Sequence, residues 1–407
     1  MKMGAMNKRL DGKHILLGIT GSIAAYKAVD VLRRLQKEGA EVRVVMTEAT
    51  QKFIAPLTFE TLTGAEVVTT MFPAQRTIRT RHVKWAEWAD CLLICPATAN
   101  LVGKIASGIA DDFLSTIVMA SRAPVIIAPA MDYEMVQNRI YLDNCKKLTD
   151  YGYIFVDTQE GELASGAVGP GRLAEPPAIL DSVYGAILGN ETWKGKKVLV
   201  SAGPTREALD PVRYLTNHSS GKMGFAMAEA AFLRGAEVTL VSGPTDLRVR
   251  KEIERIDVVT ASEMTDAILS RWPEQDILIM SAAVSDFAPI ETSGQKIKKG
   301  DTLQIALKKT TDILGALAEH PHQGIKVGFA LETENGEANA LEKLKSKKLD
   351  LICLNQPDGK TTGFGTETNQ ITLLDKTGSR NVLPLMTKWA AAEAILDHID
   401  SWVCQKK

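Results

Sequence analysis

The stretch 201–224 (SAGPTREALDPVRYLTNHSSGKMG) carries the side chains best suited to hold a phosphate: Arg206, Arg213 and Lys222. It connects an apolar, β-branched run to a small-residue run of helical character. A strand that feeds a helix through a loop presents backbone N–H groups to an anion at the start of the helix. The stretch differs from a Walker A loop, because Thr216 and Met223 stand where that pattern needs glycine and a hydroxyl residue. It therefore predicts a phosphate site, with an ordinary loop of solvated arginines as the alternative.

A second such feature lies near the start of the chain, where the apolar run HILLGIT leads into GITGSIAAYK (18–27). Small residues at the end of a strand allow a phosphate to approach the backbone closely. The glycine spacing is a weak signal, and position 47, where a dinucleotide site needs an acid, holds a threonine. These features disfavour NAD and favour a mononucleotide such as FMN.

Further polar groups follow apolar runs in the first half. The run 91–100 ends in Pro-Ala-Thr-Ala-Asn, which offers hydroxyl and amide groups to a flat cofactor, and the next run ends in PAMDYEM (129–135). His82 precedes both runs, and a catalytic and a structural role both remain open for it. The glycine-rich stretch 161–176 is typical of a flap over a site or of a long surface loop.

The second half adds an acid and several lysines. Asp286 follows a run of small residues, a position from which a carboxylate can hold Mg²⁺ at a triphosphate or cap a helix. Lys343 and Lys347 are spaced i, i+4 with no acid between them, which predicts either a bound polyphosphate or a solvated helix face. Lys296 lies in a polar, glycine-flanked loop, which by itself predicts only a solvated run of charges.

These residues need a fold that brings the ends of apolar runs together. Apolar β-branched runs alternate with amphipathic helical runs, which predicts parallel, doubly wound α/β sheets. The second half repeats the plan of the first, with GAEV after a helical run in both halves. We therefore expect two Rossmann-like domains, residues 1–189 and 190–407, each with its own site.

The composition excludes several classes of protein. The chain has 407 residues, of which 45% are hydrophobic and 24% charged, and its net charge is −1. These values are typical of a globular protein and unlike those of a nucleic-acid-binding surface. The five cysteines form no CxxC pair, which favours free thiols in a reducing cytoplasm. No signal peptide or membrane-spanning run is visible, so we expect a cytoplasmic protein without a membrane partner.

Several motifs, taken in order over residues 13–403, resemble those of the bacterial family of bifunctional coenzyme A biosynthesis enzymes. They are GITGSIAAYK, HVKWAEWAD, PATAN, PAM, GxGRLAEP, TREALDPVRYLTNHSSGKMG and KIKK. The resemblance implies a flavodoxin-like, FMN-dependent phosphopantothenoylcysteine decarboxylase domain followed by a phosphopantothenate–cysteine ligase domain. It implies 4′-phosphopantothenate, cysteine and CTP as substrates, Mg²⁺ with the nucleotide, and no nucleic acid partner.

For the decarboxylase domain, the resemblance implies an active-site histidine at His82 and FMN contacts at Gly21, Ser22, Thr47, Pro96, Ala97, Thr98 and Asn100. The family usually has asparagine and cysteine where this chain has Asp132 and Ser165, and a tryptophan where it has Val136. An ionised aspartate repels the substrate carboxylate, and a serine hydroxyl is a much weaker acid than a thiol with a pKa of about 8.5. We keep both residues as catalytic and expect a working variant decarboxylase, in which burial would allow a protonated Asp132 to donate.

For the ligase domain, the resemblance implies that an acyl-cytidylate forms at Asn217 and that Lys296 closes over it. It places Asp286 near Mg²⁺ and the triphosphate. Further CTP and substrate contacts are implied at Arg213, Met280, Ser281, Ala282, Ala283, Thr310, Thr311, Asp312, Ile313, Phe329, Lys343 and Lys347. At Thr310 and Thr311 the chain departs from the Asn-Pro of the family.

The resemblance also implies homo-oligomers: trimers of the flavin domain and dimers of the ligase domain, with a dodecamer as one assembly that uses both contacts. The alternative function is an active ligase whose N-terminal half is an FMN-binding assembly scaffold, and Asp132 and Ser165 are the features that support it. A tandem NAD(P) oxidoreductase is disfavoured by Thr47 and by the glycine spacing.

Overall fold

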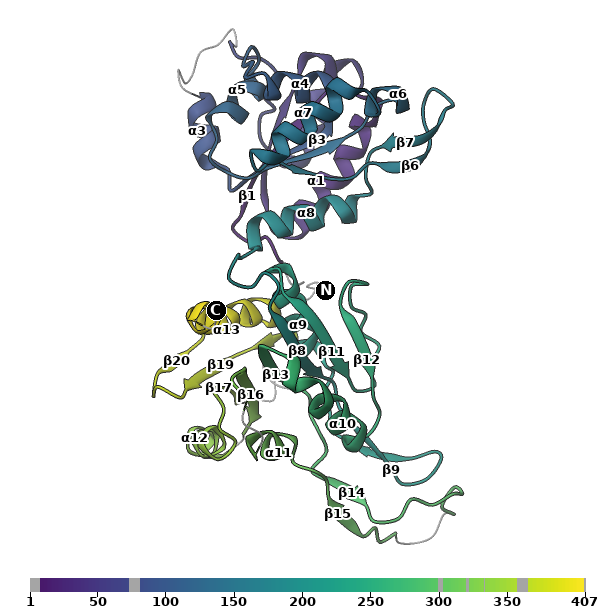
Figure 1. The fold of residues 1–407 in the computed structure, drawn as a ribbon, viewed down its shortest axis with the longest axis vertical. Helices are drawn as coiled ribbons and strands as arrows, with labels where there is room; N and C mark the ends of the chain where they lie inside the picture. The colour runs from purple at the N-terminus through teal and green to yellow at the C-terminus, as the bar shows by residue number, and fades with distance from the viewer. Residues whose placement is uncertain are drawn as a thin grey trace. The chain divides into compact units, whose positions relative to one another are not determined.

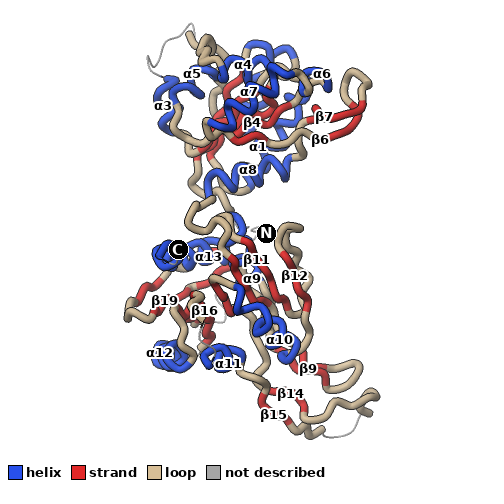
Figure 2. Tube along the Cα trace, viewed as in Figure 1, coloured by secondary structure: helices blue, strands red, loops and turns tan. Residues whose placement is uncertain are grey.

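The computed structural model describes residues 8–72, 81–298, 303–319, 322–332, 334–356 and 365–405. Contacts within the chain divide it into two compact units, one over Lys8–Leu188 and one from Gly189 onward (Figure 1). Each unit contains a central sheet with helices on it (Figure 2). Within the described residues, no helix combines the length and the apolar character needed to cross a membrane.

The first unit is built on a five-stranded parallel sheet with the order β2–β1–β3–β4–β5. The strands are β1 (His14–Ile19), β2 (Glu41–Met46), β3 (Cys91–Ala97), β4 (Val125–Pro129) and β5 (Ile154–Phe155). In the register, Ile15 of β1 lies opposite Val42 on one side and Cys91 on the other. All residues of β3 and β4 are buried, as expected of parallel strands that are covered on both faces.

Two groups of helices cover this sheet. α1 (Ala28–Lys37) contacts α8 (Pro176–Leu188). The second group makes its own series of contacts and consists of α3 (Arg81–Trp88), α4 (Ala99–Ala106), α5 (Phe113–Ala120) and α7 (Arg139–Asp150). Pro56 separates two helical segments: η2 (Glu48–Lys52) ends before it and α2 (Pro56–Thr63) begins at it, because proline fits only the first turn of a helix.

The second unit is built on an eight-stranded sheet with the order β12–β11–β8–β13–β16–β17–β19–β20. The first six strands are parallel, and each of the last two runs antiparallel to its neighbour. Their bounds are β8 (Lys197–Ala202), β11 (Glu237–Ser242), β12 (Glu254–Asp257), β13 (Ile277–Met280), β16 (Ile325–Leu331), β17 (Leu351–Asn355), β19 (Ile371–Asp375) and β20 (Arg380–Val382).

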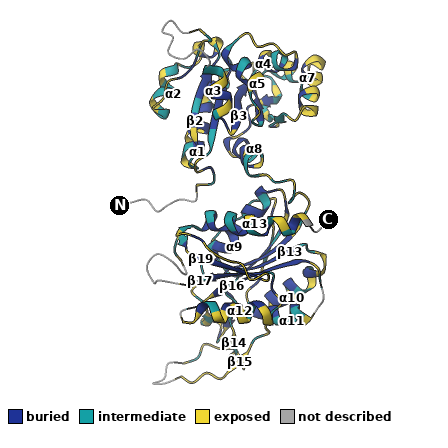
Figure 3. Cartoon of the chain, turned by 90° about the vertical axis from the view of Figure 1, so that its left-hand side faces the viewer, coloured by how far each residue is buried: buried dark blue, intermediate teal, exposed yellow. Residues whose placement is uncertain are grey.

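Two helical layers enclose the sheet of the second unit (Figure 3). α9 (Lys222–Leu233) and α13 (Lys388–Gln405) pack against each other in one layer. The other layer consists of α10 (Ala261–Arg271), α11 (Ile313–Glu319) and α12 (Gly336–Ser346). The central strands between the layers are buried. Because these strands are parallel, each connection from a strand to the next helix emerges at the carboxyl end of the sheet.

The internal repeat seen in the sequence has a structural counterpart. The strands β11–β8–β13–β16–β17 of the second unit repeat the order β2–β1–β3–β4–β5 of the first. β12 extends the second sheet beyond β11, and in the first unit Val68 forms a single parallel bridge to Val45 at the corresponding edge. The predicted fold class, two doubly wound α/β units, is confirmed.

Two stretches that we expected to be loops contain β-hairpins. Within 201–224, β9 (Arg206–Ala208) pairs with β10 (Tyr214–Thr216), and β6 (Gln159–Glu162) pairs with β7 (Val168–Arg172) at the flap. Two more short pairs follow in the second unit: β14 (Phe287–Pro289) with β15 (Leu307–Lys309), and β18 (Thr368–Asn369) with β21 (Met386–Thr387). These strands are two to five residues long, and most of their residues are exposed or half-buried, so they lack the apolar alternation that reveals a strand in sequence.

Candidate active sites

In the first unit, polar contacts join the carboxyl ends of β1, β3 and β4. Thr20 donates its hydroxyl to the Pro96 carbonyl (2.7 Å) and accepts from the Thr98 N–H (2.9 Å). The Ser22 hydroxyl donates to the Ala130 carbonyl (3.3 Å). Doubly wound sheets with this strand order bind ligands outside the carboxyl ends, at the switch point between the first and third strands. Five predicted cofactor residues lie at that switch point: Gly21, Ser22, Pro96, Ala97 and Thr98.

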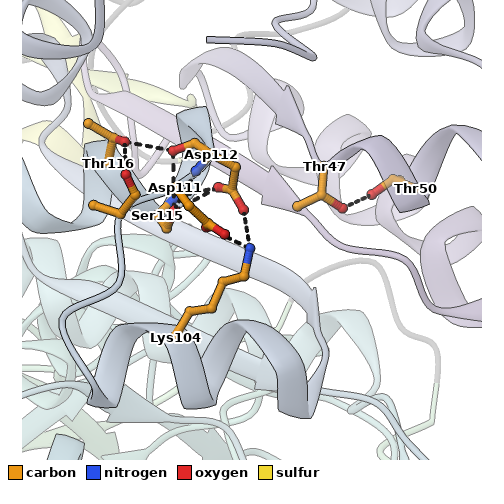
Figure 4. A network of polar contacts seen from close by, with 8 residues as sticks. Thr47, Thr50, Lys104, Asp111, Asp112, Ser115 and Thr116 are labelled. Atoms are coloured by element: carbon orange, nitrogen blue, oxygen red, sulfur yellow. Dashed lines mark hydrogen bonds and ion pairs between the residues drawn. The ribbon is translucent and has the colours of Figure 1, made fainter.

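The turn after β2 packs against the same switch point. The Thr47 N–H donates to the Ile19 carbonyl (3.0 Å), and the hydroxyls of Thr47 and Thr50 are 2.9 Å apart (Figure 4). Gly21 approaches this turn so closely that a Cβ on it would lie 2.6 Å from the Cβ of Ala49. Thr47 is therefore held beside the end of β1, close to Gly21, another of the predicted FMN contacts.

A network of charged groups holds the helices that follow β3. The Lys104 ammonium on α4 contacts the carboxylates of Asp111 (2.7 Å) and Asp112 (3.0 Å), and Asp112 caps α5 by accepting from the Ser115 N–H (Figure 4). Asn100, the remaining predicted cofactor residue, lies exposed in the first turn of α4. The network fixes the helix that carries Asn100, but Asn100 itself is not drawn into the strand-end contacts.

Asp132 and Ser165, the two residues that depart from the family pattern, are in direct contact. The Ser165 hydroxyl donates to Asp132 Oδ2, and the Glu134 N–H donates to Asp132 Oδ1 (3.3 Å). Asp132 is half-buried at the start of α6 (Tyr133–Val136), and Ser165 lies in the exposed loop between β6 and β7. The carboxylate is an acceptor in both contacts and is not buried, so the reason to expect Asp132 to donate a proton is removed.

A glycine brings the flap onto this pair. Gly171 in β7 has a φ of +139°, and its carbonyl accepts from the Met131 N–H (3.1 Å). A Cβ at position 171 would overlap the Met131 carbonyl oxygen. Glycine is therefore required for the hairpin to lie against residues 131–133, and this packing places Ser165 beside Asp132.

His82 lies half-buried on α3, whose Trp85 packs into the core. The neighbouring Arg81 forms an ion pair with Glu66 (2.8 Å), and the hydrogen bond from Arg81 holds the pKa of Glu66 below its usual value. The His82 ring makes no hydrogen bond or ion pair with any residue described in this chain. One copy of the chain therefore does not join His82 to the Asp132–Ser165 pair.

In the second unit, a cavity of about 1030 Å³ lies at the carboxyl end of the sheet. Its size suits a ligand as large as a nucleotide. The predicted ligase residues that line it are Asn217, Met280, Ser281, Ala282, Ala283, Asp286, Thr310, Thr311, Asp312, Ile313, Phe329, Lys343 and Lys347. Arg213 and Lys296 are not among its lining residues.

Asn217 fastens the segment that follows β13. Its Nδ2 donates to the carbonyls of Ala283 (3.0 Å) and Val284 (3.2 Å). Thr310 holds the same segment from the other side, because its hydroxyl donates to the Ser285 carbonyl (2.6 Å) and its N–H to the Asp286 carbonyl (3.0 Å). The cavity wall that carries Asp286 is thus positioned by two residues that are distant in sequence.

The predicted lysine pair enters the cavity from α12. The Lys343 ammonium donates to the Phe329 carbonyl (3.0 Å), and burial lowers the pKa of Lys343 despite the nearby acids. Lys347 forms an ion pair with Asp312, which also caps α11 through the Gly315 N–H (2.9 Å). No acid lies between the two lysines in the sequence, but Asp312, just before α11, pairs with Lys347, so solvation alone does not account for Lys347.

Asp286 is exposed on the cavity wall just before β14. The alternative that it caps a helix is wrong, since the chain enters the strand β14 directly after Asp286. No group of three or more His, Cys, Asp or Glu side chains that could hold a metal ion occurs in the part of the chain that the structure describes. A cation at Asp286 would therefore need oxygen ligands from a bound substrate.

Among the lining residues that were missed in the sequence are two buried polar ones, Asn369 and Lys388. Lys388 is only 5% exposed, and its ammonium donates to Asn369 Oδ1 (3.2 Å). The available signal was a lysine at the first position of a helix, where the helix dipole favours acids. Lys222, which the sequence analysis did single out, occupies the same position in α9 and also lines the cavity.

Arg213 has a different role from the predicted phosphate contact. Its guanidinium contacts Asp210 (2.6 Å) and the Ile297 carbonyl (2.7 Å), and the Ile297 N–H donates to Asp210 (3.1 Å). Burial would raise the pKa of Asp210, but these hydrogen bonds outweigh it and hold the pKa well below its usual value. Asp210 and Arg213 therefore clamp the backbone next to Lys296, whose own ammonium contacts none of the described residues. Lys299 of the same motif lies outside the described residues.

Comparison with known proteins connects both units to one group. Residues 3–188 match the family described as Flavoprotein, and residues 193–403 match the DNA/pantothenate metabolism flavoprotein C-terminal domain. The coenzyme A biosynthesis bifunctional protein CoaBC of Bacillus subtilis (strain 168) is 44% identical over 394 residues, which cover 96% of this chain and 97% of the relative. The protein of that name from Escherichia coli (strain K12) is 42% identical over 395 residues, with the same coverage. A crystal structure of the C-terminal domain of a CoaBC protein covers 53% of this chain and 100% of its own, at 38% identity and a TM-score of 0.47.

Proposed function

The chain belongs to the family of bifunctional coenzyme A biosynthesis proteins, and we propose that its two units catalyse consecutive steps of that synthesis. The second unit joins cysteine to 4′-phosphopantothenate with CTP, and the first unit decarboxylates the product to 4′-phosphopantetheine. The observation that supports this most strongly is the cavity of the second unit, which gathers an amide, an acid and lysines around a space large enough for a nucleotide. Identity over nearly the full length to relatives named bifunctional does not favour the scaffold alternative for the first unit.

The ligase reaction would proceed in two displacements. A carboxylate oxygen of 4′-phosphopantothenate attacks the α-phosphorus of CTP, and pyrophosphate leaves. The cysteine amine then attacks the acyl carbon of the acyl-cytidylate, and CMP leaves. Lys343 and Lys347 would neutralise phosphate charge from α12, Asn217 would hold the reacting end of the cavity, and Lys296 would approach from its clamped loop.

The size of the cavity and the carboxylate of Asp286 support the proposal of a magnesium-bound triphosphate. Mg²⁺ is usually held by one or two carboxylates together with phosphate oxygens, and Asp286 offers one carboxylate at the wall. The ion would neutralise charge on the phosphates while Asp286 fixes its position. Removal of divalent ions should therefore stop ligation and leave decarboxylation unaffected.

The donor set of the first unit fits FMN. Hydroxyls and small residues meet at the switch point, and Phe53, which is 50% exposed, offers a ring that could flank the cofactor. When bound there, FMN would supply the reversible two-electron redox chemistry that decarboxylation of the cysteine moiety needs. Asp132 would orient the Ser165 hydroxyl, Ser165 would protonate the carbon that lost CO₂, and His82 would contact the substrate.

The placement of His82 supports an assembled site. Its ring makes no hydrogen bond or ion pair with the described residues of its own chain, which is consistent with a flavin site shared between copies of the first unit. We infer trimers of the first unit, dimers of the second, and an assembly that uses both. All five cysteines are free thiols, which supports residence in a reducing compartment such as the cytoplasm.

The proposed function is tested by a product assay with mass spectrometry. The purified chain is given 4′-phosphopantothenate, cysteine, CTP and Mg²⁺. We expect 4′-phosphopantetheine, CMP and pyrophosphate. Accumulation of 4′-phosphopantothenoylcysteine would leave the first unit as a scaffold, and unchanged CTP would refute the ligase.

Flavin binding is tested separately by Gly21→Ala. The added Cβ would meet the Ala49 Cβ at 2.6 Å and displace the turn that holds Thr47. Overpacking of this kind costs about 1–3 kcal/mol, equivalent to roughly five- to 150-fold weaker binding. The flavin retained after purification should therefore fall, as measured by its visible absorbance per chain. Gly185→Ala on α8 is the matched control, because open space surrounds position 185. Equal flavin loss in both variants would contradict this placement.

The clamp on the Lys296 loop is tested by Asp210→Asn. An amide nitrogen accepts no hydrogen bond, so the new side chain loses the bonds from the Arg213 guanidinium and the Ile297 N–H if its nitrogen replaces Oδ2, and those from the Val212 and Arg213 N–H groups if it replaces Oδ1. Either loss loosens the backbone beside Lys296. We expect kcat for ligation to fall about tenfold, which corresponds to one lost hydrogen bond. The dissociation constant for CTP should change less than twofold, since Asp210 does not line the cavity. Asp276→Asn, which also removes a carboxylate bound to a backbone N–H, should leave kcat unchanged. A loss of CTP affinity equal to the loss of kcat would refute a positioning role.

A further inference from the structure

A buried threonine follows the equivalent strand of each unit. Thr20 lies directly after β1 and is 1% exposed, and Thr205 lies three residues after β8 and is 0% exposed. β1 and β8 occupy the same place in the two sheets, because the strand order around them is repeated. Both threonines therefore lie at the switch point, the place where sheets of this kind bind their ligands.

Thr205 fastens the segment that follows β13, the strand next to β8 (Figure 1). The Thr205 N–H donates to the Ala283 carbonyl (3.3 Å), and the Thr205 hydroxyl accepts from the Ser285 N–H (2.9 Å). A backbone N–H that is withdrawn from water needs an acceptor. The hydroxyl of Thr205 therefore determines where the backbone lies directly before Asp286.

The same pattern of contacts recurs at Thr20. The Thr20 N–H donates to the Pro96 carbonyl (3.2 Å), and the Thr20 hydroxyl accepts from the Thr98 N–H, again two residues further along. The segment held in this way follows β3, which is next to β1 in its sheet as β13 is next to β8. One device thus serves both switch points, although the residues around the two threonines differ.

Thr205 is also joined to the turn that carries Asn217. The Thr216 hydroxyl donates to the Thr205 carbonyl (2.7 Å). Asn217, the next residue, donates to the carbonyls of Ala283 and Val284. Thr205, the turn at Asn217 and the segment after β13 therefore form a closed set of contacts, in which Thr205 is the member common to the other two.

Thr205 acts from behind the cavity wall. Asn217 and Asp286 line the cavity, whereas Thr205 is not among its lining residues. Loss of the Thr205 hydroxyl would therefore remove no direct contact with a ligand. It would shift Asp286 relative to Asn217, and an error of about 1 Å in such an alignment can slow a reaction roughly 100-fold.

We propose that Thr205 is a positioning residue of the ligase reaction, and that Thr20 has the same role at the cofactor site of the first unit. The inference rests on the proposed function, which assigns ligation to the second unit and flavin binding to the first. The Thr205 hydroxyl holds the wall that carries Asp286 against Asn217 while a carboxylate oxygen of 4′-phosphopantothenate attacks the α-phosphorus of CTP.

The test compares Thr205→Val and Thr205→Ser in the full chain, with pyrophosphate release as the measured rate. Valine keeps the shape of threonine and lacks the hydroxyl, so kcat should fall about 10- to 100-fold. KM for CTP should stay within about threefold, because the interaction lost is one of alignment and not of binding. Serine keeps the hydroxyl, so Thr205→Ser should retain at least about a third of the normal kcat.

Two further variants serve as comparisons. Thr265→Val is the matched control, because Thr265 is 5% exposed and its hydroxyl donates to the Ala261 carbonyl (2.7 Å) within α10. It should leave kcat for ligation unchanged. Thr20→Val should lower the flavin retained per chain, measured by visible absorbance, and Thr20→Ser should restore it.

The outcomes separate this inference from the proposed function. If the wild-type chain releases no pyrophosphate, the proposed function fails and the inference fails with it. If the wild-type chain is active, a normal kcat in Thr205→Val refutes the positioning role. A kcat for Thr205→Ser as low as that for Thr205→Val also refutes it, because the methyl group and not the hydroxyl would then matter.

Damage to the fold has its own signature. Equal losses of kcat and CTP affinity in Thr205→Val, together with a lowered Tm, would refute the positioning role. If Thr205→Val does not fold, Thr205→Ala and Thr205→Ser replace it, because these two variants differ only in the hydroxyl. A low kcat in Thr205→Ala with a retained kcat in Thr205→Ser, at equal KM for CTP, supports the role of Thr205, and equal kcat values refute it.

Discussion

Asn217→Asp should lower kcat for ligation about 100- to 1,000-fold, the loss seen when a single preorganised donor is removed from an active site. The Asn217 amide donates to the carbonyls of Ala283 and Val284. A carboxylate has no N–H to donate and would place negative charge against both oxygens. The segment that carries Asp286 would move, and the reacting phosphate would lose its alignment. The measurement is the rate of pyrophosphate release.

Two comparisons make this prediction specific. Asn381→Asp adds the same charge at an exposed position of β20 and should leave the rate unchanged. The Asn217→Asp chain should still decarboxylate added 4′-phosphopantothenoylcysteine at the normal rate, because that reaction belongs to the other unit. Retention of more than a tenth of the ligation rate would show that the reaction needs neither the Asn217 amide nor its hydrogen bonds to Ala283 and Val284.

Ser165→Ala should change the product of the first unit, as well as its rate. Ser165 lies on the flap with its hydroxyl on Asp132, and we propose it as the proton donor of the last step. Without a donor the reaction should stop after CO₂ has left, because the hydride cannot return to a carbon that is not protonated. In a single turnover, mass spectrometry should find a product lighter than 4′-phosphopantetheine by two hydrogens. Ser182→Ala on α8 should give the normal product.

The reverse change tests the same assignment. A thiol, with a pKa of about 8.5, gives up its proton far more readily than a hydroxyl. Ser165→Cys should therefore accelerate the last step, and Asp132→Asn should remove the negative charge that opposes the substrate carboxylate. The double variant carries the asparagine and cysteine that are usual in the family at these two positions, and it should be the fastest of the series. Full-mass product from Ser165→Ala at an unchanged rate would show that the proton comes from another group.

The contact between Asp132 and Ser165 changes how the two departures from the family pattern are understood. In the sequence they are 33 positions apart and look like independent losses. In the structure the carboxylate accepts the hydroxyl, so each residue satisfies the other. The pair is thus a coherent replacement, which agrees with an active first unit better than with scattered decay.

Strand positions and the locations of the sites were predictable from the sequence. Buried strands such as β1, β3, β8 and β13 are continuous apolar runs, and helices such as α1 show apolar spacing of 3.6 residues. Polar residues just after such runs must meet at one edge, since all parallel strands end on the same side of the sheet. Asp286, which follows the run that forms β13, could therefore be expected at that edge, whereas the family resemblance implied that Asn217 and Lys343 belong to the same site, and all three line one cavity.

Contacts between distant segments were decided by tertiary structure alone. Lys388 joined the cavity because α13 packs on α9, an association that depends on the order of strands and not on any local pattern. Arg213 looked like a phosphate ligand by residue type, but a buried Asp210 three residues earlier takes its guanidinium. The residues that stand at strand ends can be identified from the sequence, because hydrophobic periodicity is a local property. Only the fold decided which partner each charge meets, because a buried charge binds the nearest complementary group in space, wherever that group lies in the chain.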